Sequence, residues 1–257
     1  MTGTDYWYDK WQGNNNSTGC VIRVTNKCDQ ECRHCLFRSG PKCVGQMSVE
    51  TCRRINKWIP EGILPNIMGG EFSILDNYPE MLVELARNRN HVRLVTNGFW
   101  SKTEKGITKF LNAREHILRV CGRVDIILST DKWHESSSYR DAAKILATFE
   151  SVLDFNSFNK APTTDHLAPV GRAWDNNVTT CNNIHCSCEQ MSNMIIIENG
   201  AVGRCPFGYF PWQHFSETTW YDAQEYVWGW RSEKLAEGMN CHACMECVKA
   251  AHCWVVK

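Results

Sequence analysis

The sequence has no excess charge and no long apolar run, and each absence excludes a class of protein. Its 257 residues include 28 basic and 28 acidic side chains, so the formal net charge is zero. A neutral chain lacks the basic surface that attracts nucleic acids or anionic membranes. Its longest apolar runs, such as residues 194–197, are far too short to span a bilayer. We therefore expect no nucleic-acid partner and no membrane partner.

The sequence also lacks a secretion signal. No basic and then apolar leader opens the chain, and residues 1–20 are polar and aromatic. We therefore expect a soluble, cytoplasmic protein. Cysteine, in contrast, is abundant, with fifteen residues. In a chain without a secretion signal, so many cysteines favour metal ligands over disulfides.

Three of these cysteines fall in one short segment. Cys28, Cys32 and Cys35 have a C-x3-C-x2-C spacing directly after the apolar run 21–24. Three thiolates at this spacing can surround one iron–sulfur centre. No fourth ligand follows, because Cys43 lies beyond a Gly-Pro turn, whereas structural zinc uses a closed set of four ligands. The segment predicts a metal centre with one open position, and the motif alone leaves a zinc knuckle or incidental thiols as the alternatives.

Residues 21–175 alternate short apolar runs with amphipathic helical segments, which is typical of a parallel α/β fold. Strands are expected at 65–68, 92–96, 124–128 and around 152–158. Helix starts are expected after Ser48, near Asn77, at a capping box of Ser101 and Glu104, and at residue 138. Polar motifs stand where three strands end, a position that carries the chemistry in α/β barrels: Gly69-Gly70-Glu71, Thr96-Asn97-Gly98 and Ser129-Thr130-Asp131.

The cysteine spacing after a first strand, followed by Gly69-Gly70-Glu71, resembles the radical S-adenosylmethionine (SAM) superfamily. The resemblance implies that Cys28, Cys32 and Cys35 hold a [4Fe–4S] cluster, and that SAM chelates its fourth iron. Reductive cleavage of SAM would then release a 5′-deoxyadenosyl radical. The resemblance also implies an α/β fold built as a shortened partial (β/α) TIM-type barrel of about five to six parallel strands.

The same resemblance implies roles for individual residues. The Glu71 carboxylate is expected to pair with the amino group of SAM, and the two preceding glycines would let the ligand lie against the backbone. The other residues expected to bind the cofactors are His34, Gly69, Gly70, Thr96, Asn97, Ser129 and Arg172. Asp131 and His134 are the candidates for catalysis, with His134 as a general acid or base and a solvated loop as the alternative.

The last third of the chain is rich in cysteine around a predicted hairpin, whose turn is Asn199-Gly200. This arrangement resembles the twitch and SPASM extensions of radical SAM enzymes, which carry one and two auxiliary iron–sulfur clusters. We expect an N-terminal tail at 1–20, the barrel at 21–175, and a small cysteine-rich, hairpin-containing domain at 176–257. The residues alone are also compatible with a zinc ribbon, which remains the alternative. The candidate ligands are Cys181, Cys186, Cys188, Cys205, Cys241, Cys244, Cys247 and Cys253.

Taken together, the resemblance implies a radical SAM oxidoreductase or maturase with SAM, a [4Fe–4S] cluster and one or two auxiliary [4Fe–4S] clusters. We expect it to abstract a hydrogen atom from a peptide-type substrate, leading to oxidation, crosslinking or epimerisation. An external one-electron reductant of the flavodoxin or ferredoxin type would be its partner. The alternatives are a radical SAM dehydrogenase or epimerase of a small molecule such as an amino sugar, and a non-catalytic zinc-binding interaction protein.

Overall fold

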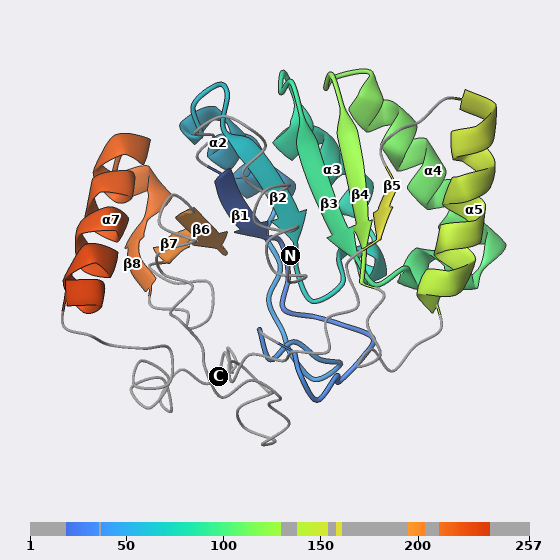
Figure 1. Cartoon of the computed structure of the whole chain (residues 1–257), viewed down its shortest axis with the longest axis horizontal. Helices are drawn as coiled ribbons and strands as arrows, with labels where there is room; N and C mark the ends of the chain where they lie inside the picture. The colour runs from blue at the N-terminus through green and yellow to red at the C-terminus, as the bar shows by residue number, and fades with distance from the viewer. Residues whose placement is uncertain are drawn as a thin grey trace, which may run out of the picture.

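The computed structural model describes residues 19–35, 37–129, 138–153, 158–160, 195–203 and 211–236. These residues form one eight-stranded sheet with helices packed against it (Figure 1). The strands are β1 (Gly19–Arg23), β2 (Leu64–Met68), β3 (Val92–Thr96), β4 (Val124–Leu128), β5 (Phe158–Lys160), β6 (Ile195–Glu198), β7 (Ala201–Gly203) and β8 (Pro211–His214). The helices are α2 (Val49–Trp58), α3 (Tyr78–Ala86), α4 (Glu104–Leu118), α5 (Ser138–Leu153) and α7 (Trp220–Ala236), with the short η1 (Phe72–Ile74), η2 (Phe99–Lys102) and η3 (Phe215–Glu217).

The strands lie in the order β5-β4-β3-β2-β1-β6-β7-β8. Neighbouring strands from β5 to β6 are parallel, whereas the pairs β6–β7 and β7–β8 are antiparallel. Five consecutive parallel strands with intervening helices confirm the predicted α/β class. The carboxyl ends of β1 to β4 therefore meet at one edge of the sheet, which is the lower edge in Figure 1. Closure into a partial barrel and a separate cysteine-rich domain stay predictions.

The predicted hairpin is present, and it extends the main sheet. Asn199 and Gly200 join β6 to β7 with φ angles of 49° and 86°, the positive values that a tight hairpin turn favours. Strand β6 pairs with β1, with Arg23 opposite Glu198 in the register. The hairpin thus lies beside the first strand, 175 residues away in sequence. The division of the chain at residue 176 stays a prediction.

Helix starts follow the predicted capping chemistry in one case and depart from it in another. Ser48 caps α2, and its hydroxyl oxygen accepts a hydrogen bond from Thr51 N at 2.9 Å. The capping box expected at Ser101 is wrong, because Thr103 caps α4 by accepting from Gly106 N at 3.0 Å. Ser101 lies in η2 instead, where its hydroxyl donates to Gly98 O at 2.8 Å.

The end of α5 also differs from the sequence-based expectation. The helix continues to Leu153, and β5 begins only at Phe158. The strand expected at 152–158 is therefore wrong over most of its length. The helix, which buries Ala142 and Leu146 against the core, continues into the first residues of the expected strand.

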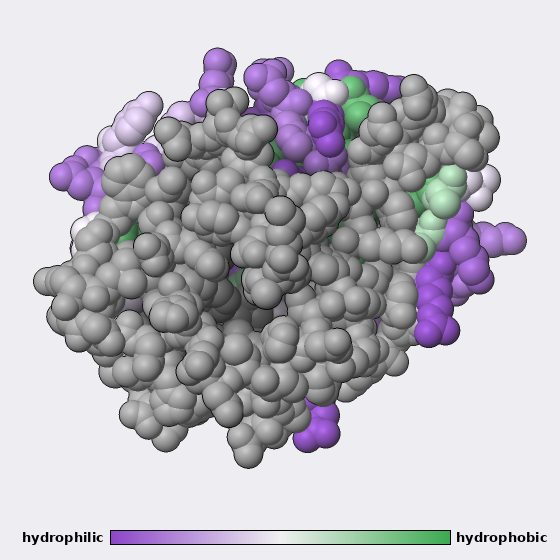
Figure 2. Space-filling view, in the orientation of Figure 1, coloured by the Kyte–Doolittle hydropathy of each residue, from purple (hydrophilic) through white to green (hydrophobic). Residues whose placement is uncertain are grey.

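One apolar core joins the sheet to its helices. Helix α2 packs beside α3, and α3 beside α4, on the face that lies behind the sheet in Figure 1. Helix α7 joins this layer through Trp58 of α2, whose Nε1 donates to Thr218 O at 2.7 Å and whose ring lies 5.1 Å from that of Trp220. The described atoms visible at the rim of the molecule are mostly hydrophilic (Figure 2). No described helix is long and apolar enough to cross a membrane.

Candidate functional site

The cysteine-bearing loop after β1 is closed at its base and lies at the carboxyl edge of the sheet (Figure 1). Met47 N donates to Val24 O at 2.8 Å, and Asn26 N donates to Gly45 O at 3.2 Å. A third hydrogen bond lies farther into the loop, where Cys28 N donates to Gly40 O at 3.2 Å. These bonds fix both ends of the segment that carries the three cysteines, so the loop has a defined position relative to the strand ends.

The three thiols of this loop lie at or below the surface. Cys32 is buried, and Cys28 and Cys35 are partly buried. Burial raises the pKa of the Cys28 thiol, a backbone hydrogen bond from Gln30 works against this, and the charges of Glu71, Asp29 and Cys35 raise the pKa further. A thiolate at this position therefore needs a nearby positive charge, which a metal centre supplies.

The donor set fits an iron–sulfur cluster, since it consists of three thiols on one anchored loop. Among the residues that the structure describes, however, no three His, Cys, Asp or Glu side chains converge as metal ligands. The type of the donors thus fits the predicted centre, and its ligand set stays a prediction.

Gly69 and Gly70 lie against the cysteine loop. Gly70 N donates to Thr25 O, and Glu71 N donates to Lys27 O, both at 2.8 Å. A Cβ at Gly70 would lie 2.1 Å from Lys27 O, and a Cβ at Gly69 would lie 2.9 Å from Thr25 O. The missing side chains therefore allow two backbone segments to touch. The close approach of a ligand to Gly69 and Gly70, which the sequence also predicts, stays a prediction.

Glu71 is fully buried, and its carboxylate joins the ends of β2 and β3. Oε2 accepts from Asn97 N at 2.7 Å, and Oε1 accepts from Ser73 N at 3.1 Å and from Ser73 Oγ at 2.6 Å. The Thr96 hydroxyl lies 2.9 Å from both carboxylate oxygens. Burial raises the pKa of Glu71, and the hydrogen bonds from Ser73, Asn97 and Thr96 partly offset this. In this arrangement the side chain positions two strand ends, and its predicted pairing with SAM stays a prediction.

Asn97 connects this network to the cysteine loop. Its Nδ2 lies 2.8 Å from Asp29 Oδ1 and 3.8 Å from Cys28 Sγ. Asp29 in turn accepts from Lys102 Nζ at 3.0 Å. Asp29 and Lys102 were not among the site residues predicted from the sequence. A carboxylate between two cysteines was a visible signal for the first, but no spacing rule marks the second.

A second buried connection runs from β1 to the hairpin. Arg23 donates to both Glu198 and Asn26, and Asn26 Nδ2 donates to Glu198 Oε1 at 2.8 Å. The Arg23 guanidinium also lies 4.1 Å from the centre of the Phe37 ring, which follows the last cysteine of the loop. Arg23 and Glu198 are 5% and 3% exposed. This buried ion pair therefore joins the hairpin to the end of β1, where the cysteine loop begins.

The structure brings together some of the predicted site residues. Cys28, Glu71, Thr96 and Asn97 form one connected group, and Ser129 N donates to Thr96 O at 2.9 Å, next to it. His34 lies in the cysteine loop and is partly buried. The remaining predicted residues lie outside the described part of the chain, namely Asp131, His134, Arg172, Cys181, Cys186, Cys188, Cys205, Cys241, Cys244, Cys247 and Cys253.

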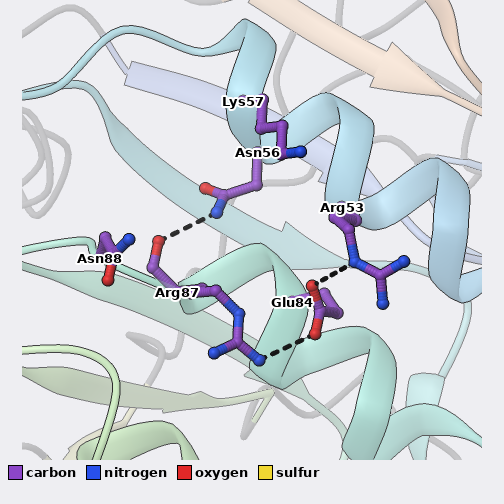
Figure 3. Close-up of a pocket in the computed structure, with 6 residues that line it drawn as sticks. All are labelled: Arg53, Asn56, Lys57, Glu84, Arg87 and Asn88. Carbon is purple, nitrogen blue, oxygen red and sulfur yellow. Dashed lines mark hydrogen bonds and ion pairs between the residues drawn. The ribbon is translucent and has the colours of Figure 1, made fainter.

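A pocket of about 380 Å³ lies away from this group, between the carboxyl ends of α2 and α3 (Figure 3). Arg53 Nε and Arg87 Nη2 each donate to Glu84 at 2.9 Å, and Asn56 Nδ2 donates to Arg87 O at 2.9 Å. The hydrogen bond from Arg87 helps to lower the pKa of Glu84. Basic side chains near helix carboxyl ends are favoured by the helix dipole. Local pairing and this dipole account for the charges of the pocket.

No family model matches the chain. Two curated proteins of Bacillus subtilis (strain 168) are similar in sequence. The "Putative peptide biosynthesis protein YydG" is 25% identical over 159 residues, which cover 57% of this chain and 47% of that protein. The "Antilisterial bacteriocin subtilosin biosynthesis protein AlbA" is 29% identical over 86 residues, which cover 33% of this chain and 19% of that protein. The matched region thus spans less than half the length of either relative.

Among solved structures, the fold is similar to a crystal structure of BtrN in complex with AdoMet and 2-DOIA. The TM-score is 0.55 at 16% sequence identity, and the match covers 84% of this chain and 86% of that one. At this identity the likeness shows a shared fold.

Proposed function

We propose that this chain is a radical SAM enzyme that modifies a peptide. The observation that carries the proposal is the docking of the three-cysteine loop on Gly70 and Glu71, with Asn97 at 3.8 Å from Cys28. The loop that carries the three thiols is thus bound to the end of β2, at the carboxyl side of the parallel sheet. Ligands of α/β barrels bind on that side. The fold shared with BtrN supports the same reading.

The residues of this chain have defined parts in the proposal. Cys28, Cys32 and Cys35 would hold the [4Fe–4S] cluster, because thiolates are its usual ligands. The partly exposed backbone of Gly69 and Gly70 would face SAM. Once bound, these cofactors supply one-electron cleavage of the SAM sulfonium and removal of a substrate hydrogen atom. The buried Glu71 carboxylate keeps the two strand ends in register beneath that site.

Other cofactor contacts are proposed from sequence and position. His34 and Ser129 lie in or beside the described group, and Arg172 is proposed from its motif alone. Asp131 and His134 follow β4 in sequence, so they would reach the same edge as Ser129. An external one-electron reductant of the flavodoxin or ferredoxin type would supply the electron.

A peptide is the proposed substrate because both curated relatives carry names of peptide-related biosynthesis. Oxidation, crosslinking and epimerisation are the reaction types that we propose for it. A small-molecule substrate is the second candidate, and one observation favours it: the structure with the shared fold holds AdoMet and 2-DOIA. Incubation of candidate peptides and amino sugars with enzyme, SAM and reductant, followed by mass spectrometry, separates the two.

Iron content and SAM cleavage test the enzyme proposal itself. Protein purified and reconstituted without oxygen should be brown and contain iron and sulfide. With dithionite and SAM it should release 5′-deoxyadenosine. A colourless protein that contains zinc, which has a filled d shell, would contradict the proposal and favour the zinc-binding interaction protein.

The C-terminal cysteines are proposed to hold an auxiliary cluster of the twitch or SPASM type that turnover needs. Cys188 and Cys205 would act with Cys241 and Cys244 at one such site, and the remaining cysteines of residues 181–253 could supply a second. Replacement of Cys205 and Cys244 by alanine should lower the iron content, spare 5′-deoxyadenosine release and abolish product. Unchanged product formation by that variant, or zinc at the site, would contradict this part of the proposal.

A further inference from the structure

The Asn97 side chain has a fixed orientation beside Cys28. Its Oδ1 accepts a hydrogen bond from Phe99 N at 2.9 Å, so the oxygen of the amide faces its own turn. The amide nitrogen must then point the other way, toward the cysteine loop. There it lies 2.8 Å from Asp29 Oδ1 and 3.8 Å from Cys28 Sγ. A primary amide has two N–H groups, one for each of these two acceptors.

The backbone around Asn97 holds the side chain in this place. Asn97 N donates to the buried Glu71 carboxylate at 2.7 Å, and Gly98 N donates to Thr96 Oγ1 at 3.1 Å. Gly98 has a φ of 81°, a left-handed conformation that starts the turn into η2. Asn97 itself is 6% exposed. The amide therefore reaches the sulfur from a rigid support.

We propose that Asn97 is a positioning residue for Cys28. The side-chain amide N–H of Asn97 donates to the Cys28 sulfur and thereby raises the reduction potential of the cluster that Cys28 helps to hold. The inference rests on the proposed function, which makes Cys28 a cluster ligand. Hydrogen bonds to ligand sulfurs are among the factors that set iron–sulfur potentials. An N–H donor stabilises the more electron-rich sulfur of the reduced state, so its loss lowers the potential.

Asp29 and Lys102 complete the arrangement. Asp29 Oδ1 accepts from the Asn97 amide, and Asp29 Oδ2 accepts from Lys102 Nζ at 3.0 Å. The lysine offsets the negative charge that the aspartate brings close to Cys28. Asp29 thus serves as the acceptor that orients the amide, while its charge remains paired.

Asn97→Ser is the variant that tests the side-chain amide N–H of Asn97 separately from its other hydrogen bonds. The serine hydroxyl can still accept from Phe99 N, as short polar side chains do in such turns, and the backbone N–H to Glu71 is unchanged. The shorter side chain removes the donor to Cys28 and leaves the net charge unchanged. Asn97→Asp removes the same donor and adds a negative charge. Thr103→Ala is the control, because it removes one hydrogen bond, the α4 cap, from the segment that follows the same turn.

The full-length, anaerobically reconstituted proteins would be titrated with dithionite in the absence of SAM, so that contacts of Asn97 with SAM do not contribute. The signal to follow is the reduced-cluster signal that is absent when Cys28, Cys32 and Cys35 are all replaced by alanine. We expect the midpoint potential to fall in the order wild type, Asn97→Ser, Asn97→Asp, with iron content retained and with Thr103→Ala equal to wild type.

Two results would overturn the inference. One is an Asn97→Ser potential equal to that of the wild type, or shifted no more than that of Thr103→Ala. The other is loss of the cluster iron from Asn97→Ser, which would give the residue a purely structural part. Failure of the proposed function gives a different result, because the wild-type protein would then show no such redox signal at all.

Discussion

Replacement of Gly70 by alanine tests how the cysteine loop is held. A Cβ at this position would lie 2.1 Å from Lys27 O and 2.6 Å from the Lys27 carbonyl carbon. Real Cβ atoms essentially never approach closer than 3.0 Å, so the strand end and the loop must separate by the difference, about 0.9 Å. Both contacts are with backbone atoms, which cannot turn aside as a flexible side chain can.

The expected cost follows from the hydrogen bonds at this contact. Separation of the two segments weakens the bonds from Gly70 N to Thr25 O and from Glu71 N to Lys27 O, both 2.8 Å long. An unpaired buried backbone group costs about 1–3 kcal/mol, so the two together should lower the free energy of unfolding by about 2–6 kcal/mol. We also expect less iron per chain after reconstitution, because the cysteine loop loses its support.

Anaerobic urea unfolding and an iron assay measure both effects. Gly229→Ala is the matched control, because Gly229 lies exposed in α7 and no described heavy atom lies within 4 Å of its Cβ position. Alanine is preferred over glycine in a helix by about 1 kcal/mol, so this variant should be slightly more stable than the wild type. If Gly70→Ala unfolds at the wild-type urea concentration and binds wild-type iron, the argument that the loop rests on Gly70 is refuted.

Two further predictions concern the buried networks. Glu71→Ala leaves the N–H donors of Ser73 and Asn97 without their acceptor. It should lower the free energy of unfolding, measured in urea, by about 2–6 kcal/mol, because each unpaired buried donor costs about 1–3 kcal/mol, and the loss should be smaller for Glu71→Gln. Wild-type stability of Glu71→Ala would contradict this role. Glu198→Leu leaves the buried Arg23 charge without its partner and should lower the free energy of unfolding by about 3–5 kcal/mol. The double variant with Arg23→Met should recover part of this loss. A double variant as unstable as the sum of the two single variants would show that the pair is not coupled.

Local signals predicted the elements of this fold, because they depend on neighbouring residues. The hydroxyl of Ser48 accepts from a backbone N–H of the helix it begins, and Asn199-Gly200 supplies the positive φ angles of a hairpin turn. The same reasoning was wrong at Ser101, where two hydroxyl residues compete for one helix start. Thr103 caps α4, and Ser101 closes the preceding turn instead. Sequence alone does not say which hydroxyl the turn geometry selects.

Contacts between distant segments could not be predicted, since they depend on strand register. Nothing near Arg23 indicates that Glu198 lies opposite it, because the pairing of β1 with β6 is set by the whole sheet. The glycines show the same limit. Their presence was a visible signal, but only the structure shows that Gly70 packs against Lys27 O. Asn97 was identified as a site residue, while its contact with Cys28 requires the loop to fold back.

Formation of 5′-deoxyadenosine by the protein, with and without its three loop cysteines, tests the central claim most directly. The wild type and a variant with Cys28, Cys32 and Cys35 all replaced by alanine would be reconstituted without oxygen and incubated with SAM and dithionite. The account predicts that the wild type releases 5′-deoxyadenosine and that the triple variant releases none, while any iron held by the C-terminal cysteines remains. Release of 5′-deoxyadenosine by the triple variant, or none from an iron-loaded wild type, would contradict it.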